Sequence, residues 1–173
     1  MPDVEDQVGE VEFISENGNP CSPIVQIATG RTHVIALDTT GKIYSWGRND
    51  FGQLGLGQTR QIEVPKLDSY GRKHAVNEDQ IITIQDRPAQ IKALKDKQIC
   101  QIYAGDQQSF AVTRDGEVFA WGNNKYKQLL ILPSKSAASQ MAEADTEASE
   151  QDFNKQIVFK PRQIKFSEYA FGK

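Results

Sequence analysis

Two stretches of the sequence match each other residue by residue: QIATGRTHVIALDTTGKIYSWG at residues 26–47 and QIYAGDQQSFAVTRDGEVFAWG at residues 101–122. Their glycines and tryptophans pair at a constant spacing of 75 residues, without a gap. The pairs are Gly30 with Gly105, Gly41 with Gly116, Trp46 with Trp121, and Gly47 with Gly122. Beyond them the match continues through Asn49 and Asn124, Gln53 and Gln128, and Leu54 and Leu129. Because an internal repeat decides the architecture of a chain, we expect two copies of one supersecondary unit.

Each copy has the pattern of a β-hairpin. In the first copy, the apolar runs 34–37 and 43–46 are joined by a tight-turn composition that ends in Gly41. In the second copy, residues 110–112 and 118–121 flank a turn that contains Asp115 and Gly116. An Asp-Gly pair between apolar runs is among the strongest hairpin signals in a sequence. Gly30 and Gly105 precede the first strand, where a turn or a close approach of a neighbouring sheet excludes a Cβ. The sequence therefore predicts small antiparallel sheets.

The order of the repeated residues resembles the repeat of the regulator of chromosome condensation family, whose members form seven-bladed β-propellers. The first copy has nearly the whole pattern: Gly30, His33, Ala36, Leu37, Gly41, Trp46, Gly47, Asn49, Gly52, Gln53, Leu54, Gly55, Leu56 and Gly57. The second copy has Gln108 in place of the histidine, and Lys127, Leu130 and Leu132 in place of three glycines. It looks like a diverged blade. The resemblance implies that His33 makes a structural hydrogen bond between strands, as opposed to acting as a general base.

The expected fold is all-β: a partial β-propeller of two four-stranded antiparallel blades plus the first strand of a third, with two inserted loops. Pro88, Gln90, Ile91 and Leu94 resemble the strand that opens a family repeat, and KPRQIKF at residues 160–166 resembles it again. Within residues 1–173 this gives blade one at 8–67, an insert at 68–87, and blade two at 88–133. An acidic, Ser- and Ala-rich insert follows at 134–155, and the start of a third blade at 156–173.

The inserts lie outside the repeat and are free to bind a partner. Tyr70, Arg72, Lys73 and His74 in the first insert are our partner-binding candidates, although an insert rich in polar residues is usually just an exposed loop. The run 81–84 forms an added hairpin or lies on a partner. The second insert has five acidic residues and two lysines, a composition that is typical of a solvated loop. The alternative is a helix over 137–153 that docks on a partner.

The sequence offers few groups for chemistry. His33 and His74 are the only histidines, and Cys21 and Cys100 are far apart, so no catalytic, metal-binding or cofactor-binding set is expected. The glycines of residues 52–57 match neither the Walker pattern nor the G-x-G-x-x-G pattern of phosphate-binding loops. Trp46 and Trp121 recur in phase, which favours packing between sheets over a stacking platform for a ligand. We therefore expect no enzyme.

Charge and hydropathy exclude two classes of partner. The net charge is −3, and no dense run of Lys and Arg predicts contact with nucleic acid. No run of about 18 apolar residues predicts a membrane span. Reduced thiols and the lack of a signal peptide favour the cytoplasm, with a cytoskeletal assembly preferred and the nucleus as the alternative.

A propeller closes with about 4 to 8 blades, so we expect other protein chains or further sequence to complete this one. The leading hypothesis is a scaffold subunit of a larger assembly. The alternative, implied by the resemblance alone, is that the chain is part of a guanine-nucleotide exchange factor. Such a factor acts on a small GTPase and associates with chromatin. A regulatory fragment of a ubiquitin ligase is the third hypothesis.

Overall fold

The structure, a computed structural model, describes residues 11, 13, 20–57, 60–63, 81–131 and 156–165. Its strands are β1 (Ile24–Thr29), β2 (His33–Asp38), β3 (Ile43–Arg48), β4 (Arg60–Glu63), β5 (Ile81–Gln90), β6 (Ile99–Ala104), β7 (Gln108–Thr113), β8 (Val118–Asn123) and β9 (Ile157–Ile164). One short 3-10 helix, η2 (Lys92–Leu94), links β5 to β6. The expectation of an all-β fold is confirmed.

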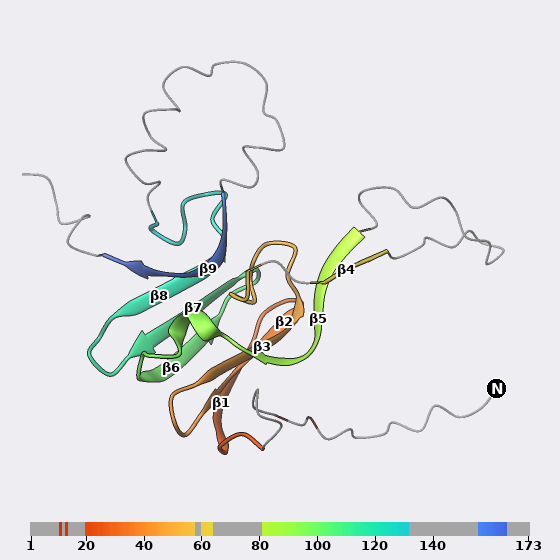
Figure 1. Cartoon of the computed structure of the whole chain (residues 1–173). Helices are drawn as coiled ribbons and strands as arrows, with labels where there is room; N and C mark the ends of the chain where they lie inside the picture. The colour runs from red at the N-terminus through yellow and green to blue at the C-terminus, as the bar shows by residue number, and fades with distance from the viewer. Residues whose placement is uncertain are drawn as a thin grey trace, which may run out of the picture.

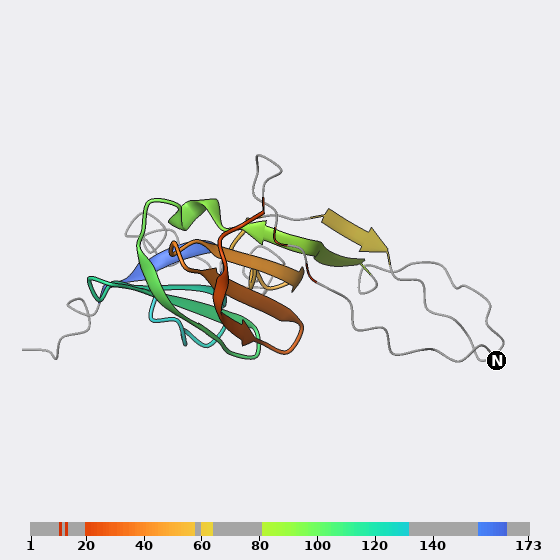
Figure 2. The ribbon, with the colours of Figure 1, turned by 90° about the horizontal axis from the view of Figure 1, so that it is seen from below.

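The strands form two antiparallel sheets that lie side by side (Figures 1 and 2). The first sheet, blade one, has the order β1-β2-β3-β5-β4, and the second sheet, blade two, has the order β6-β7-β8-β9. The repeat is visible in the register, since Ile27 pairs with Ala36 where Ile102 pairs with Ala111. Every residue of the second pairing lies 75 positions after its counterpart, as the sequence predicts.

The turns explain two of the repeated glycines. Gly41 has a φ of +86° and Gly116 a φ of +81°, a region that other residues adopt only at a cost. In the first turn, one carboxylate oxygen of Asp38 accepts hydrogen bonds from the backbone of Thr40 and of Lys42, at 2.8 and 2.9 Å. A side chain that satisfies turn amides in this way fixes the hairpin locally.

β5 and β9 hold equivalent places, since each is the fourth strand in the order of its blade. Gln90 pairs with Tyr44 and Gln163 pairs with Phe119, and the two partners are again 75 residues apart. Pro88 precedes Gln90 as Pro161 precedes Gln163, and each proline lies beside a register shift, where a strand tolerates a missing N–H.

This pairing refines the sequence-based prediction. Residues 157–164, expected to open a third blade, form the outer strand of blade two, and residues 81–90, divided between an insert and the start of blade two, form one strand of blade one. β4 adds a fifth strand to blade one. The domain boundaries drawn from the sequence remain a prediction.

The two blades share one apolar core. Both sheets contribute its buried side chains, which are Ile35, Leu37, Ile43, Ile91, Leu94, Ile99, Ile102, Ala111, Phe119, Ala120, Trp121, Leu129, Val158 and Ile164. β6 packs against both β1 and β2, which places the centre of the core between the sheets. Because burial of apolar surface is the main stabilising contribution to folding, the blades stabilise each other.

A line of polar contacts crosses this core at the backbone carbonyl of Gln53. The Ser109 hydroxyl and the Trp121 indole N–H both donate to that carbonyl, at 2.8 and 2.9 Å. The His33 Nε2 lies 2.9 Å from the Ser109 Oγ. Because the single Ser109 hydroxyl proton is donated to Gln53, His33 must donate through Nε2. Nδ1 is buried without a partner beside Gly30, so a second proton there would have no acceptor, and the histidine is neutral.

Glutamine forms a second connection between the blades. The Gln26 side chain donates to the carbonyl of Ile102 at 2.7 Å and accepts from its N–H at 3.0 Å. Ile102 lies on the edge strand of blade two, so both of its backbone groups would otherwise lack a partner inside the interface. We call this pair of hydrogen bonds the glutamine clamp.

Acidification is predicted to weaken the fold through His33. Burial lowers the pKa of His33 from 6.5 to about 4, so below pH 6.5 the unfolded chain binds a proton that the folded chain does not. This contribution to stability is complete above pH 6.5 and is lost as the pH falls towards 4, amounting to about 3 kcal/mol. Urea unfolding between pH 8 and pH 4 measures it. The His33→Gln variant should show a flatter pH dependence, and an equally steep dependence in both proteins would contradict the assignment.

Gly55 is predicted to be essential to the interface because of what it touches. A Cβ at Gly55 would lie 2.8 Å from the Trp121 Nε1, whereas a Cβ at Gly116 would meet nothing within 4 Å. Both glycines have positive φ, so alanine adds about 1–2 kcal/mol of backbone strain at either position. Overpacking adds a further loss of about 1–3 kcal/mol at Gly55 alone. Urea unfolding of Gly55→Ala and Gly116→Ala tests this, and equal losses would refute the contact.

Candidate partner-binding faces

Blade one leaves open the face that lies away from blade two. Side chains alternate along β1: Gln26 and Ala28 face blade two, while Val25 and Ile27 point the other way and are 59% and 58% exposed. Ile102, the counterpart of Ile27, is completely buried between the blades. An apolar position that is buried in the second copy of the repeat is thus exposed in the first copy. We call this exposed surface of blade one the incoming face.

Blade two also has an open face, which lies away from blade one. Its residues are the counterparts of those by which blade one contacts blade two. Gln101, the counterpart of Gln26, is exposed, and its side-chain oxygen accepts a hydrogen bond of 3.1 Å from the Tyr103 hydroxyl. Tyr103 is 50% exposed and Leu130 is 43% exposed. Gln128 is exposed as well, whereas its counterpart Gln53 is only 1% exposed between the blades. We call this surface the outgoing face.

The incoming face has an aromatic corner formed partly from outside the repeat. The ring of Phe13 contacts Tyr44 and Trp46 edge-on, with centroids 5.8 and 5.6 Å away. The backbone carbonyl of Phe13 accepts from the N–H of Cys21 at 2.9 Å, which ties this residue to the start of the blade. Burial of Tyr44 raises the pKa of its phenol, with its contacts to Cys21 and Asp38 adding to the shift. The corner is therefore apolar and uncharged.

The residues predicted from the sequence divide into two groups. The partner-binding candidates Tyr70, Arg72, Lys73 and His74 lie outside the described residues and stay a prediction. The repeat residues form the framework of the blades, where Gly47 and Gly122 have φ of +103° and +106° and lie against the backbone of the preceding turn. Trp121 lies between the blades, and Trp46 lies at the open face.

Sequence reasoning did not single out the residues that join the blades, nor the residue that completes the aromatic corner of blade one. Gln26, Ser109 and Phe13 were not among the candidates, and Gln53 was noted only as part of the repeat. Gln26 and Gln101 do recur at the 75-residue spacing, and this signal was sufficient to find the glutamine clamp. Phe13 has no counterpart in the repeat, so no periodic signal marks it.

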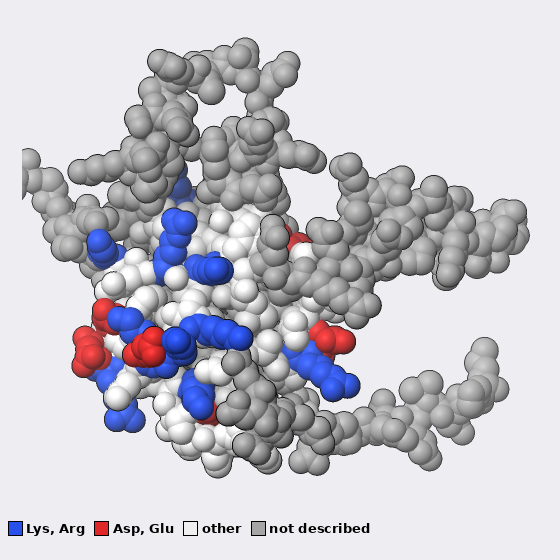
Figure 3. Space-filling view, in the orientation of Figure 1, with Lys and Arg blue, Asp and Glu red and all other residues white. Residues whose placement is uncertain are grey.

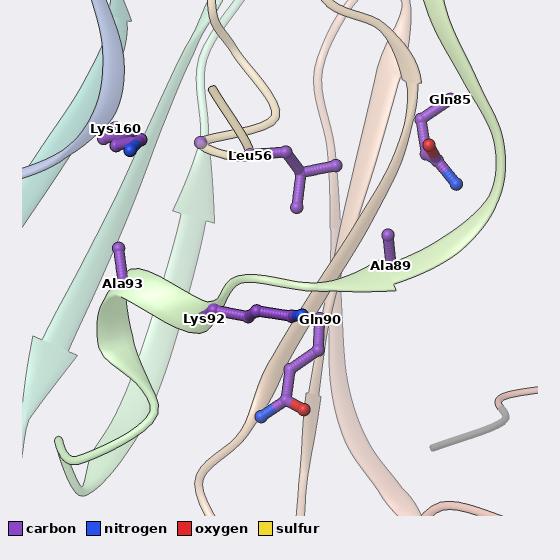
Figure 4. Close-up of a pocket in the computed structure, with 8 residues that line it drawn as sticks. Leu56, Gln85, Ala89, Gln90, Lys92, Ala93 and Lys160 are labelled. Carbon is purple, nitrogen blue, oxygen red and sulfur yellow. The ribbon is translucent and has the colours of Figure 1, made fainter. Parts of the chain in front are cut away.

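A pocket of about 640 Å³ opens where the blades meet at their outer strands. Its lining residues are Gly55, Leu56, Gln85, Ala89, Gln90, Lys92, Ala93 and Lys160. In Figure 4, Leu56 projects between Lys160 on one side and Gln85 and Ala89 on the other. Its lining combines two amide and two lysine side chains with the apolar side chains of Leu56, Ala89 and Ala93.

The described part of the chain is basic, although the whole chain is acidic. It holds fourteen Lys and Arg against eight Asp and Glu, whereas the complete sequence has a net charge of −3. β9 and η2 are neighbours, and Figure 3 shows basic side chains gathered on the face they share. The exposed basic residues in or next to η2 and β9 are Lys92, Lys95, Lys160, Arg162 and Lys165. This surface could not be predicted from the sequence because its residues come from separate segments.

Two kinds of feature are absent from the described residues. No group of three or more His, Cys, Asp and Glu side chains there is placed to hold a metal ion. None of the helices in this part of the chain has the length and hydrophobicity of a membrane-crossing segment.

Sequence profiles of the regulator of chromosome condensation (RCC1) repeat match this chain. One profile matches residues 40–112, and a second matches residues 24–53 and 99–128. The second pair of matches coincides with the two copies of the repeat, and together the profiles span both blades from β1 to the loop after β8.

Related proteins contain the same region as a small part of their length. The probable E3 ubiquitin-protein ligase HERC4 of Rattus norvegicus is 37% identical over 106 residues, which are 61% of this chain and 8% of that protein. The ultraviolet-B receptor UVR8 of Arabidopsis thaliana is 35% identical over 106 residues, 61% of this chain and 19% of the receptor.

Solved structures show the same fold. Prp20p from Saccharomyces cerevisiae, described with its binding properties to Gsp1p and histones, superposes with a TM-score of 0.56 at 19% identity. The superposition covers 89% of this chain and 27% of Prp20p. Repeat spacing, blade pairing, profile matches and fold agree, and the chain belongs to the regulator of chromosome condensation repeat family.

Proposed function

We propose that this chain is a non-enzymatic protein-interaction module, a scaffold part of a larger assembly in which other chains or further sequence complete the propeller. The observation that carries the proposal is the contrast between Ile102 and Ile27. The same residue of the repeat is completely buried between the blades and 58% exposed at the incoming face. A surface built like a protein interior is a surface for a protein partner.

The exposed apolar residues of the incoming face lie on an edge strand. β1 and β6 are edge strands in their sheets, and the apolar side chains of Val25 and Ile27 line β1. An edge strand with exposed apolar side chains is prone to associate with another chain unless something covers it. The glutamine clamp on Ile102 shows what such a cover provides: apolar contact together with partners for the edge backbone.

The comparisons support an interaction role in general, and they leave the partner open. The chain spans 8% and 19% of the two relatives described above, so the activities of those proteins are not assigned to it. Exchange-factor activity is the second candidate, and it rests on the likeness to Prp20p. At 19% identity that likeness shows the fold alone, and the scaffold role is therefore preferred.

Capture of partners by single-residue variants tests the proposal. The full chain is tagged, purified gently from its native cell and crosslinked, and bound proteins are identified by mass spectrometry. We expect Ile27→Asp to lose the partners that wild type retains, because it places a charge in an apolar contact. Tyr126→Ser is the matched control, since Tyr126 is 79% exposed in a loop of blade two. Equal recovery from both variants would refute a role for the incoming face, and recovery of a small GTPase would favour the exchange-factor candidate.

A further inference from the structure

Basic side chains surround the pocket at the junction of the two blades. Lys92, Lys95, Lys160, Arg162 and Lys165 are exposed in or next to η2 and β9, which are neighbours in the fold (Figure 3). Two of these residues, Lys92 and Lys160, also line the pocket of about 640 Å³. We call the five residues together with the pocket the basic surface. Positive charge and a concave site therefore coincide at one place.

Few acidic side chains of the described residues offset this charge. No Asp or Glu occurs from residue 156 to residue 165, and Asp96 is the only acidic residue among residues 91–98. Glu117, which precedes β8, is already engaged. Its carboxylate accepts from the Lys97 Nζ at 2.6 Å and from the Gln163 Nε2 at 3.1 Å. The basic surface thus keeps an excess of positive charge.

The contact between the blades holds Lys160 in place. The carbonyl of Phe159 accepts a hydrogen bond from the N–H of Gly57 at 3.0 Å. The stem of Lys160 lies against Gly57, where a Cβ would come 3.3 Å from the Lys160 Cε. Between Val158 and Arg162 the register of β9 with β8 shifts, as at a β-bulge. A lysine whose stem is packed loses less conformational freedom when its amine binds a ligand.

The pocket beside these lysines has a partly apolar lining. Its apolar side chains are Leu56, Ala89 and Ala93, and its amides are Gln85 and Gln90. Figure 4 shows Leu56 projecting into the space between the lining residues, with Lys92 extending beneath it. The volume falls within the range of about 300–1,000 Å³ that is typical of ligand pockets. Such a site can take an aliphatic side chain while the lysines attract carboxylates at its rim.

Two observations favour an acidic polypeptide over a nucleic acid as the ligand. Nucleic-acid-binding domains typically have an isoelectric point above about 9, whereas that of this chain is about 5.4. Single-stranded nucleic acids stack their bases on aromatic side chains, and none of the residues that line the pocket is aromatic. A peptide needs neither feature, because its carboxylates pair with lysines and its aliphatic side chains fill apolar space.

We propose that the basic surface binds a linear acidic segment of a partner protein. One aliphatic side chain of that segment occupies the pocket, and the Asp or Glu side chains on either side of it lie beside Lys92, Lys160 and their basic neighbours. The basic surface shares no residue with the incoming face, so this inference goes beyond the proposed function and does not depend on it. Because the charges are exposed, rising salt weakens the binding.

Fluorescence anisotropy of a labelled peptide, Glu-Glu-Glu-Leu-Glu-Glu-Glu, measures binding to the full chain. Lys92→Glu combined with Lys160→Glu should weaken binding at least about tenfold, because two attractions become repulsions. Arg31→Glu combined with Lys125→Glu is the matched control, since it makes the same change of charge at exposed residues outside η2 and β9. This control should bind as wild type does. Ile27→Asp should also bind normally, which separates this result from that of the capture experiment.

A second pair of measurements tests the pocket apart from the charges. A peptide with Ser in place of the central Leu should bind about fivefold more weakly, because it loses the burial of an aliphatic side chain. Ala93→Phe fills the pocket from an exposed position of η2 without changing any charge. This variant should bind the Leu peptide more weakly and leave binding of the Ser peptide unchanged.

Several outcomes would overturn the proposal. They are no binding of the Leu peptide to wild type up to about 1 mM, an equal loss in the control pair, equal binding of the two peptides, and tighter binding of an oligothymidine of equal charge. A further variant replaces the five acidic residues of 134–155 by their amides. Tenfold tighter binding of the peptide to that variant would assign the basic surface to this segment of the chain, against a partner. Far-UV circular dichroism confirms that each variant is folded.

Discussion

The contact on which the arrangement of the two blades depends is the Gln53 carbonyl, which accepts hydrogen bonds from Ser109 and Trp121 of the other blade. It is reached only because Gly55, two residues later, leaves room for the indole ring. Because the Ser109 hydroxyl donates its hydrogen bond to this carbonyl, His33 must donate to Ser109 through a protonated Nε2. One backbone atom thus links the loop of blade one, the strands of blade two and the neutral state of a buried histidine.

The sequence was sufficient to predict the repeat, the hairpins and the all-β class, because these follow from local patterns: alternating apolar residues, turn glycines and a fixed spacing. The pairing of residues 81–90 with β3 was not predicted, since a strand and its partner separated by a long segment leave no local signal. The interface was missed for a related reason. Ser109 has Val34 as its counterpart, so its role does not repeat, and only the packed blades reveal it.

Charge provides a second example of information that folding adds. A net charge of −3 described the chain as mildly acidic, yet the described residues have more basic than acidic side chains and gather several of them over β9 and η2. Net charge sums over segments that need not share a surface, whereas a partner senses the local field within about 10 Å. The acidic side chains that set the overall sign belong mainly to residues outside the described part of the sequence.

Divergence between the copies has changed the surface of blade two and left its framework intact. Left-handed backbone at a residue with a Cβ costs about 1–2 kcal/mol, and both Lys127 and Leu130 adopt it. The side-chain oxygens of Asn124 and Gln128 accept hydrogen bonds from backbone N–H groups of the loop, as those of Asn49 and Gln53 do in blade one, and hold the loop in that shape. A repeat can therefore exchange glycines for larger residues without refolding. What changes is the surface that the loop presents, since Lys127 and Leu130 carry side chains where Gly52 and Gly55 have none.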